Sequence, residues 1–395
     1  MSLPGLFPLL TILTQLAFST ILLSGQSSSI EKPSSFCSKL ADIDKIVDRA
    51  IRQDGIPGAV VLIGYNGTTI FEKAYGNRSI QPEIEPMTID TKFDLASLTK
   101  VVATTPAIML LEQNGKLQLK DPVAKYLPQF GQFGKQNVTF HQILTHYSGL
   151  PPFFQLPKNE SFTKNQLFNK IYNITLLSKP GEEFIYSDLG FILLGKVIEK
   201  KTGQAFEHFI KMHFFSPLKM SNTGFLPCPK NYRLIAPTER LAAGMFIRGK
   251  VHDPIAAFLG GVAGHAGIFS TARDLARFCQ MLLNEGFLDG KRVLNVESVK
   301  KMIYRQSPLG KKNIRGLGWD IQSAYSSLKG SYFSPDSYGH TGFTGTSLWI
   351  DPNIQTFVIL LTNRVHPNGK GSVKNLRKQL ANIVGKTLSS EQETF

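Results

Sequence analysis

Hydrophobic and polar positions follow two different periods at the start of the chain. Residues 38–53 place apolar side chains on one side at helical spacing, which predicts an amphipathic helix. Residues 58–65 form a short apolar run typical of a buried strand, and residues 68–75 return after Asn66-Gly67. Because Asn-Gly favours the left-handed backbone of a two-residue turn, we expect a helix followed by an antiparallel hairpin.

A longer apolar stretch begins near Ser97. Residues 101–111 carry no charged side chain, which predicts a helix that is buried nearly all round. Pro106 lies within this helix and lacks a backbone N–H, so a local kink is expected there. Asn114-Gly115 follows and predicts the end of the helix.

The middle of the chain has a different pattern. Residues from about 116 to 255 have mainly helical spacing interrupted by proline and glycine, with helices expected at 140–150 and 191–200. Residues 271–285 then form a clear amphipathic helix that closes at a glycine.

Strand patterns return in the last third of the sequence. Four short runs separated by turns predict a meander, followed by a helix at residues 371–388; the runs are 318–322, 337–341, 346–351 and 356–362. The hairpin and the meander are each flanked by a terminal helix. We therefore predict an α/β (α+β) fold, in which one antiparallel sheet is built from both ends of the chain and an all-helical lobe is inserted at about 116–255.

The N-terminal segment differs from the rest in composition. Residues 1–30 contain no charged side chain, and a mostly apolar run is followed by small polar residues. This predicts a secretory leader over residues 1–29, or an uncleaved N-terminal membrane anchor of about 20 residues. Either interpretation places the remaining chain outside the cytoplasm.

The net charge of +15 is strongly basic. Such a balance suits an anionic partner, but the basic residues are scattered, with one modest cluster at 370–378. No zinc knuckle or RNA-binding aromatic pattern accompanies them, so a nucleic-acid binder ranks last among the functions considered.

Ser97 and Lys100 supply the first candidate chemistry. Residues three apart lie on the same face of a helix, so the Ser97 hydroxyl and the Lys100 amine share one small site. A serine hydroxyl needs a nearby base to become a nucleophile. We expect burial among Leu95, Val101 and Val102 to lower the pKa of Lys100 and let it act as that base.

Two further motifs follow in order, Tyr186-Ser187-Asp188 and His340-Thr341-Gly342. Together with Ser97-x-x-Lys100 this set resembles the serine β-lactamase and penicillin-binding protein family, and most closely its class C-like serine hydrolases. The resemblance covers residues 38–386, which we take as one hydrolase domain. Supporting stretches stand at residues 144–151, 260–267 and 316–319.

The resemblance implies an α/β sandwich with a helical lobe and a site between the two. Ser97 would be the acylated nucleophile, Lys100 its partner base, and Tyr186 a proton relay for the leaving group. The oxyanion hole would use the backbone N–H groups of Ser97 and Phe343. No cofactor and no metal ion are implied.

The second and third motifs depart from the family pattern. His340-Thr341-Gly342 would form the edge strand beside the substrate, but it begins with histidine where lysine is usual. Asp188 stands where asparagine is usual, and its negative charge would raise the pKa of Lys100. His340 supplies less positive charge than lysine near neutral pH, so recognition of a substrate carboxylate is weakened.

Other polar residues have a plainer interpretation. The spacing of His252, Asp253 and His265 matches no zinc pattern, and we interpret His265 as a loop histidine that hydrogen-bonds the backbone and lines the cleft. His146 is interpreted as structural. Arg364 could hold a carboxylate, but a surface ion pair is the simpler interpretation.

These observations predict an extracytoplasmic serine hydrolase that works through an acyl-enzyme on Ser97. The first-choice activity is that of a penicillin-binding D,D-carboxypeptidase or a weak β-lactamase, acting on a small-molecule or peptidoglycan-like substrate. A carboxylesterase of the same fold is the close alternative. A catalytically silent wall-binding protein is the alternative of another class.

Overall fold

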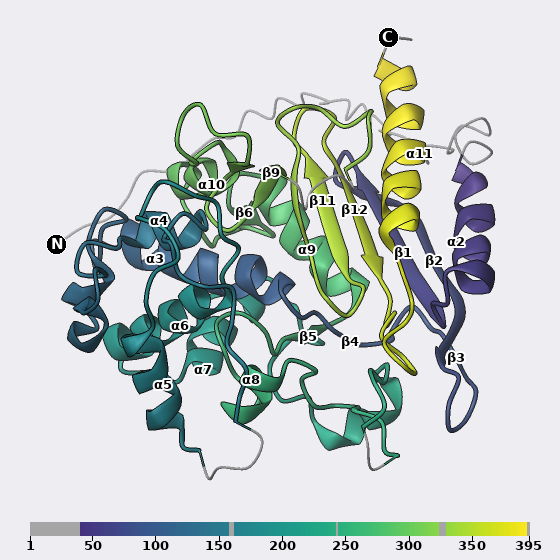
Figure 1. The fold of residues 1–395 in the computed structure, drawn as a ribbon. Coiled ribbons are helices and arrows are strands. Elements are labelled where there is room, and N and C mark those ends of the chain that lie inside the picture. The colour runs from purple at the N-terminus through teal and green to yellow at the C-terminus, as the bar shows by residue number, and fades with distance from the viewer. Residues whose placement is uncertain (1–39, 158–161, 242–243, 324–328, 393–395) are drawn as a thin grey trace, which may run out of the picture.

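Strands from both ends of the described chain form one antiparallel sheet. The computed structural model describes residues 40–157, 162–241, 244–323 and 329–392 (Figure 1). The eight strands run in the order β3-β2-β1-β12-β11-β10-β9-β8. At the centre, β1 (Gly58–Tyr65) pairs with β12 (Thr356–Leu361), which confirms the prediction of one sheet built from both ends. The other strands are β2 (Thr68–Ser79), β3 (Glu85–Pro86), β8 (Ile314–Arg315), β9 (Asp320–Gln322), β10 (Tyr338–Thr341) and β11 (Ser347–Asp351).

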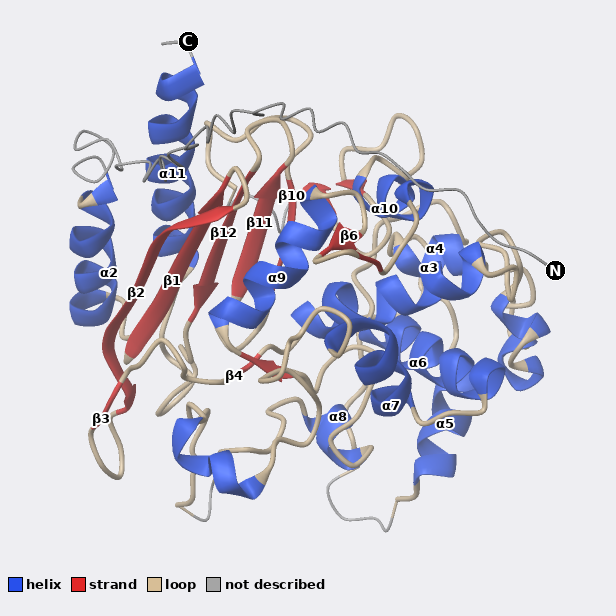
Figure 2. Cartoon of the chain, turned by 180° about the vertical axis from the view of Figure 1, so that it is seen from behind, coloured by secondary structure: helices blue, strands red, loops and turns tan. Residues whose placement is uncertain are grey.

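Helices cover both faces of the sheet. α2 (Asp42–Gln53) and α11 (Lys374–Gln392) pack together on one face, and α9 (Ala272–Leu283) lies across the other (Figures 1 and 2). Alternate side chains of β1 therefore enter two different cores: Val60 and Leu62 pack on the α9 side, and their neighbours pack against α2 and α11. Because both faces of β1 are covered by helices, its sequence is a continuous apolar run.

The hairpin between β1 and β2 is confirmed. Asn66 and Gly67 have φ angles of 46° and 79°, the left-handed values that a two-residue turn of this kind requires.

Between β4 (Phe93–Asp94) and β5 (Phe269–Ser270), the described chain consists of helices and loops beside the sheet (Figure 2). The predicted helical segment 116–255 falls within this stretch. α3 (Thr105–Gln113) precedes this segment. The α-helices within it are α4 (Phe140–Leu144), α5 (Lys164–Asn173), α6 (Asp188–Thr202), α7 (Phe206–Ile210) and α8 (Pro254–Phe258). The chain then continues through β6 (Phe287–Leu288), β7 (Lys291–Arg292) and α10 (Val296–Ile303).

The helix after Ser97 is not regular. A π-helical turn, Lys100–Thr104, precedes α3, and Pro106 lies in the first turn of α3. A wider turn relieves the clash that a proline makes with the preceding carbonyl groups, so the predicted kink takes this form. α3 ends at Gln113, and Gly115 has a φ of 67°, as the end signal predicted.

Two predicted helices have different bounds. The helix expected at 140–150 ends at Leu144, because His146 has a φ of 61° and cannot continue it. The helix expected from residue 191 begins earlier, at Asp188, because the Ser187 hydroxyl caps it by accepting from the Gly190 N–H at 3.4 Å. Asp188 is therefore the first residue of α6, and the helix fixes the direction in which its side chain leaves the backbone.

The predicted leader or membrane anchor, residues 1–29, lies outside the described residues. Within the described ranges, no helix combines the length and the apolar character needed to cross a membrane.

Candidate active site

Lys100 is the centre of a buried polar cluster. Its side chain is fully buried, and its Nζ donates to the Ser97 Oγ at 3.0 Å and to the His265 carbonyl oxygen at 3.2 Å. It also forms an ion pair with the Asp188 Oδ1 at 2.7 Å. These contacts surround the buried ammonium with oxygen atoms from three separate segments of the chain.

A pinned turn presents Ser97 at the start of the helix. Ala96 has a φ of 47°, which is strained for a residue with a Cβ, and its N–H donates to the Asp94 Oδ1 at 2.9 Å. The Thr344 hydroxyl donates to the Asp94 carbonyl at 2.7 Å, and the Thr346 hydroxyl donates to the next carbonyl at 3.0 Å. These bonds tie the nucleophile turn to the segment after β10.

The ionisation of Lys100 differs from the expectation drawn from burial. Burial acts to lower its pKa, but the charge of Asp188, the electrostatic interaction with Tyr186 and hydrogen bonds to both outweigh that effect, and the pKa rises above its ordinary value. The prediction that burial leaves Lys100 partly neutral is therefore wrong. The predicted effect of Asp188 is confirmed, because its charge is the largest contribution that raises the pKa.

The Tyr186 ring contacts both Lys100 and the His146 ring. The Lys100 Nζ lies 5.1 Å from the centroid of the Tyr186 ring, and the His146 ring stacks on the same tyrosine at 4.3 Å. The His146 Nδ1 accepts a hydrogen bond from the Ser187 N–H at 3.0 Å. Burial, followed by the charges of Arg315 and Lys100, holds the pKa of His146 well below its ordinary value, so this ring is neutral.

β10 forms the other wall of the site. A Cβ on Gly342 would lie 2.4 Å from the Leu95 carbonyl oxygen, so only glycine allows this approach to the nucleophile turn. His340 is buried, and burial holds its pKa well below the ordinary value. The prediction that His340 supplies little positive charge is confirmed. The prediction of an edge strand is wrong, because β10 pairs with β11 on one side and with β9 at Gly339 on the other. Thr341 and Phe343 line the cavity beyond that last pair, and Phe343 is 62% exposed.

A cavity of about 240 Å³ joins these residues. Its wall includes Ser97, Tyr186 and the 340–343 segment, so the three sequence motifs meet in one place. The oxyanion role of the Ser97 and Phe343 N–H groups stays a prediction.

Arg364 also lines this cavity, and its interpretation as a surface ion pair is wrong. Its Nη1 donates to the Gly371 carbonyl at 3.0 Å, and its guanidinium carbon lies 4.7 Å from the Phe343 ring centroid. No carboxylate of a described residue lies within ion-pairing distance of this guanidinium.

Two arginines of the cavity wall were not predicted: Arg315, which is buried, and Arg377, which is half-buried. Arg377, from α11, donates to the Thr346 carbonyl at 2.6 Å and to the Gly342 carbonyl at 3.2 Å. Burial, followed by the charge of Arg364, lowers its pKa to about 9, so it stays charged at neutral pH. A usable signal was present: Arg377 falls on the apolar stripe of the C-terminal helix. Arg315 pairs with Asp320 at 3.4 Å across β8 and β9.

His265 has a different partner from the one expected. Its Nε2 contacts the Asp253 Oδ1 at 2.8 Å, a carboxylate and not the backbone, while its own carbonyl accepts from Lys100. His252 contacts a separate carboxylate, that of Glu239, at 3.1 Å. Among the residues that the structure describes, no group of three or more His, Cys, Asp or Glu side chains could hold a metal ion.

Comparison with known proteins bears on this arrangement. The family model named Beta-lactamase matches residues 43–383, most of the chain. The chain belongs to the beta-lactamase family. Members of this family include serine hydrolases named as carboxypeptidase, amidase and β-lactamase, so the family assignment and the predicted serine hydrolase class are confirmed.

Individual relatives agree with the family. The chain is 33% identical over 363 residues to "N-acetylmuramyl-L-alanine amidase" of Bacillus subtilis, covering 83% of this chain and 81% of that protein. It is 32% identical over 376 residues to "Putative D-alanyl-D-alanine carboxypeptidase" of Escherichia coli, covering 86% and 85%. A penicillin-binding protein homologue from Caulobacter crescentus has the same fold, with a TM-score of 0.72 at 21% identity over 88% of this chain and 97% of that one.

Proposed function

We propose that this family member is an extracytoplasmic acyl-transfer hydrolase whose nucleophile is Ser97. The observation that carries the proposal is the placement of buried Lys100, which contacts both the Ser97 hydroxyl and the Asp188 carboxylate. Ser97 and Tyr186, which both lie against this lysine, line one cavity. The first-choice substrate is a D-alanyl peptide of the cell wall, and β-lactam hydrolysis would be a weak side reaction.

The raised pKa of Lys100 supports a mechanism in which Tyr186 carries the proton transfers. Lys100 stays an ammonium and stabilises a Tyr186 phenolate, which takes the Ser97 proton as the serine oxygen bonds to the carbonyl carbon. The backbone N–H groups of Ser97 and Phe343 stabilise the oxyanion. Tyr186 then gives its proton to the leaving nitrogen as the C–N bond breaks, and water repeats the sequence to release the acyl group.

Arginines replace the charge that His340 does not supply. Arg364 and Arg377 both line the cavity, and after burial the charge of Arg364 contributes to lowering the pKa of Arg377. A carboxylate between them would relieve this repulsion and take a bidentate hydrogen bond. The terminal carboxylate of a D-alanyl peptide has this chemistry, whereas a simple ester does not.

Labelling with a fluorescent penicillin, followed by mass spectrometry, tests the proposal. We expect an adduct on Ser97 that is absent in Ser97→Ala and retained in Ser216→Ala, an exposed serine elsewhere. Release of D-alanine from diacetyl-L-lysyl-D-alanyl-D-alanine should be lost in the same variant by a factor of about 10⁴. Absence of any Ser97-dependent adduct or turnover would overturn the proposal in favour of the silent wall-binding protein.

A second candidate follows from the Bacillus subtilis relative. An amidase that cleaves an N-acetylmuramyl-L-alanine bond uses the same acyl-enzyme chemistry on another amide of the same polymer. Release of L-alanine peptides, without D-alanine release, would favour this function. Turnover of p-nitrophenyl butyrate alone would instead favour the carboxylesterase.

A further inference from the structure

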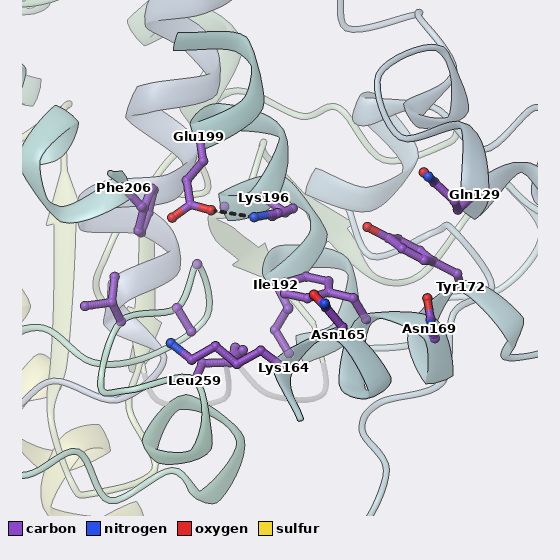
Figure 3. A pocket seen from close by; sticks show the side chains of 15 residues that line it. Gln129, Lys164, Asn165, Asn169, Tyr172, Ile192, Lys196, Glu199, Phe206 and Leu259 are labelled. Carbon is purple, nitrogen blue, oxygen red and sulfur yellow. Dashed lines mark hydrogen bonds and ion pairs between the residues drawn. The ribbon is translucent and has the colours of Figure 1, made fainter. Parts of the chain in front are cut away.

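A polar groove lies on the helical side of the molecule, apart from the catalytic cavity. It has a volume of about 590 Å³ between α5 and α6, and its floor comes from the loop at residues 259–264. Figure 3 shows Tyr172, Asn169 and Gln129 at one end of the groove. None of the three sequence motifs accounts for it.

The groove and the catalytic ion pair use the same face of α6. Asp188, Ile192, Lys196 and Glu199 are spaced at helical intervals, and the last three line the groove. Eight residues separate Asp188 from Lys196, which corresponds to about 12 Å along the helix. An extended peptide of five residues spans about 17 Å, so one glycopeptide is long enough to join two sites at this separation.

The two sites also share a wall. The Gly264 backbone lines the groove, and its carbonyl accepts from the Thr104 hydroxyl at 2.5 Å. The next carbonyl, that of His265, accepts from Lys100 at 3.2 Å. A Cβ on Gly264 would lie 2.1 Å from the Phe191 carbonyl oxygen, so the loop packs directly on α6. A ligand on this loop would therefore touch the peptide next to the one that holds Lys100.

The groove has a different chemistry from the arginine-lined cavity. Its floor is apolar, with Ile192 and Phe206 each 2% exposed. Its rim carries the amides of Gln129, Asn165 and Asn169, and no hydrogen bond joins these amides to another residue in the described part of the chain.

The charges and aromatic rings of the groove indicate which chemical class of ligand it could bind. Lys196 and Glu199 pair at 3.2 Å and offset each other's charge, as the dashed line in Figure 3 shows, while Lys164 adds one further donor. The Tyr172 ring lies 6.1 Å from Phe168 and offers an aromatic face. Amide donors and acceptors around an apolar floor suit a largely uncharged ligand with hydroxyl, acetamido and apolar faces, as an N-acetylated amino sugar has.

We propose that this groove binds an N-acetylated amino sugar, such as the sugar part of a glycopeptide substrate. The choice of sugar rests on the proposed cell-wall function, but binding itself requires no turnover. Amides bind the hydroxyl and acetamido groups, the acetamido methyl rests on the apolar floor, and Tyr172 packs on the sugar ring.

Titration calorimetry with tetra-N-acetylchitotetraose on the Ser97→Ala chain tests this site without relying on the acyl-enzyme. We expect saturable binding that weakens about tenfold in Tyr172→Ala and in Asn169→Ala, equivalent to about 1.4 kcal/mol each. The matched variants Tyr304→Ala and Asn137→Ala, exposed residues outside the groove, should bind like the parent.

Two results would overturn the proposal: no saturable binding by the parent chain, or equal binding by Tyr172→Ala and Tyr304→Ala. In chains with an intact Ser97, groove variants should leave p-nitrophenyl butyrate turnover unchanged. Failure of the penicillin labelling with preserved sugar binding would disprove the catalytic proposal and leave this one standing.

Discussion

The centre of the sheet at β1 and β12 is apolar on both faces, whereas its edge at β8, β9 and β10 carries buried charged and titratable groups. Val60 and Ile359 are fully buried members of one cluster of hydrophobic side chains. Arg315, Asp320 and His340 are buried to a similar extent but have polar partners. Arg315 pairs with Asp320 at 3.4 Å, and the His340 Nδ1 lies 2.9 Å from the Thr341 carbonyl oxygen. Burial of a charged side chain costs several kcal/mol unless polar partners compensate for the lost water. The polar edge therefore adds less to the free energy of folding than the apolar centre, but it supplies charged groups to the active site.

The largest effect is expected in the apolar centre. Ile359→Ala removes a fully buried side chain from β12 and leaves a cavity, which should lower the free energy of unfolding by about 2–5 kcal/mol. Urea denaturation followed by circular dichroism measures this loss. The specific activity of the folded fraction should be unchanged, and Ile84→Ala, at 74% exposure, serves as the control. Equal stability of the two variants would contradict the comparison.

Acid stability should depend on a carboxylate outside the sheet, that of Asp253, which caps α8 and contacts His265. The pKa of Asp253 is lowered from 3.8 to about 2: burial opposes the shift, but the charge of His265 and its hydrogen bond outweigh burial. Its contribution is present above pH 3.8 and is lost as pH falls through about 2. Asp253→Asn should therefore cost about 2 kcal/mol at pH 6 and reduce the fall in stability between pH 4 and pH 2. A parallel pH dependence in both proteins would be inconsistent with this assignment.

The fall of kcat/KM at alkaline pH should follow the loss of the proton from Lys100. Its pKa is raised, so the ammonium and its stabilising contribution persist below the ordinary value of 10.5 and are lost as pH rises through the folded value. Asp188→Asn removes the largest contribution that raises this pKa. We expect the alkaline limb of kcat/KM to move down by about 1–2 pH units in a pH series. An unmoved limb would show that Lys100 does not control it.

The smallest effect is expected for a change in substrate binding that leaves the catalytic step intact. Arg364→Gln should raise KM for a carboxylate-bearing D-alanyl peptide about tenfold, a loss of about 1.4 kcal/mol, with kcat little changed. Turnover of a neutral ester should not respond. Arg273→Gln, whose side chain is 53% exposed and paired with Glu72, is the matched control. A similar loss on both substrates would assign Arg364 a structural role instead.

Local patterns predicted the apolar centre well. β1, its Asn66-Gly67 turn and α9 follow from strand, turn and helix periodicity that each segment carries in itself. The helix expected at 140–150 was too long because the left-handed backbone of His146 is set by its contact with Tyr186, a residue distant in sequence.

The candidate active site beside the polar edge was only partly predictable for the same reason. Sequence spacing placed Ser97 beside Lys100 and indicated that Lys100 is buried. The sign of its pKa shift, however, depends on how closely α6 brings Asp188, and spacing does not give that distance. Arg377 had a signal in its position on an apolar stripe, but its target at Gly342 comes from tertiary packing alone.

The pairing of β1 with β12 has a consequence for how the molecule forms. Val60 lies opposite Leu361, so the central strand pair must close a loop of most of the chain before it gains any hydrogen bond. Such long-range closure slows folding and postpones cooperative assembly until synthesis is nearly complete. Because Arg377 comes from α11, the cavity is also unfinished until that helix docks. Nascent chains should therefore stay inactive and open to proteases until their last helix is in place.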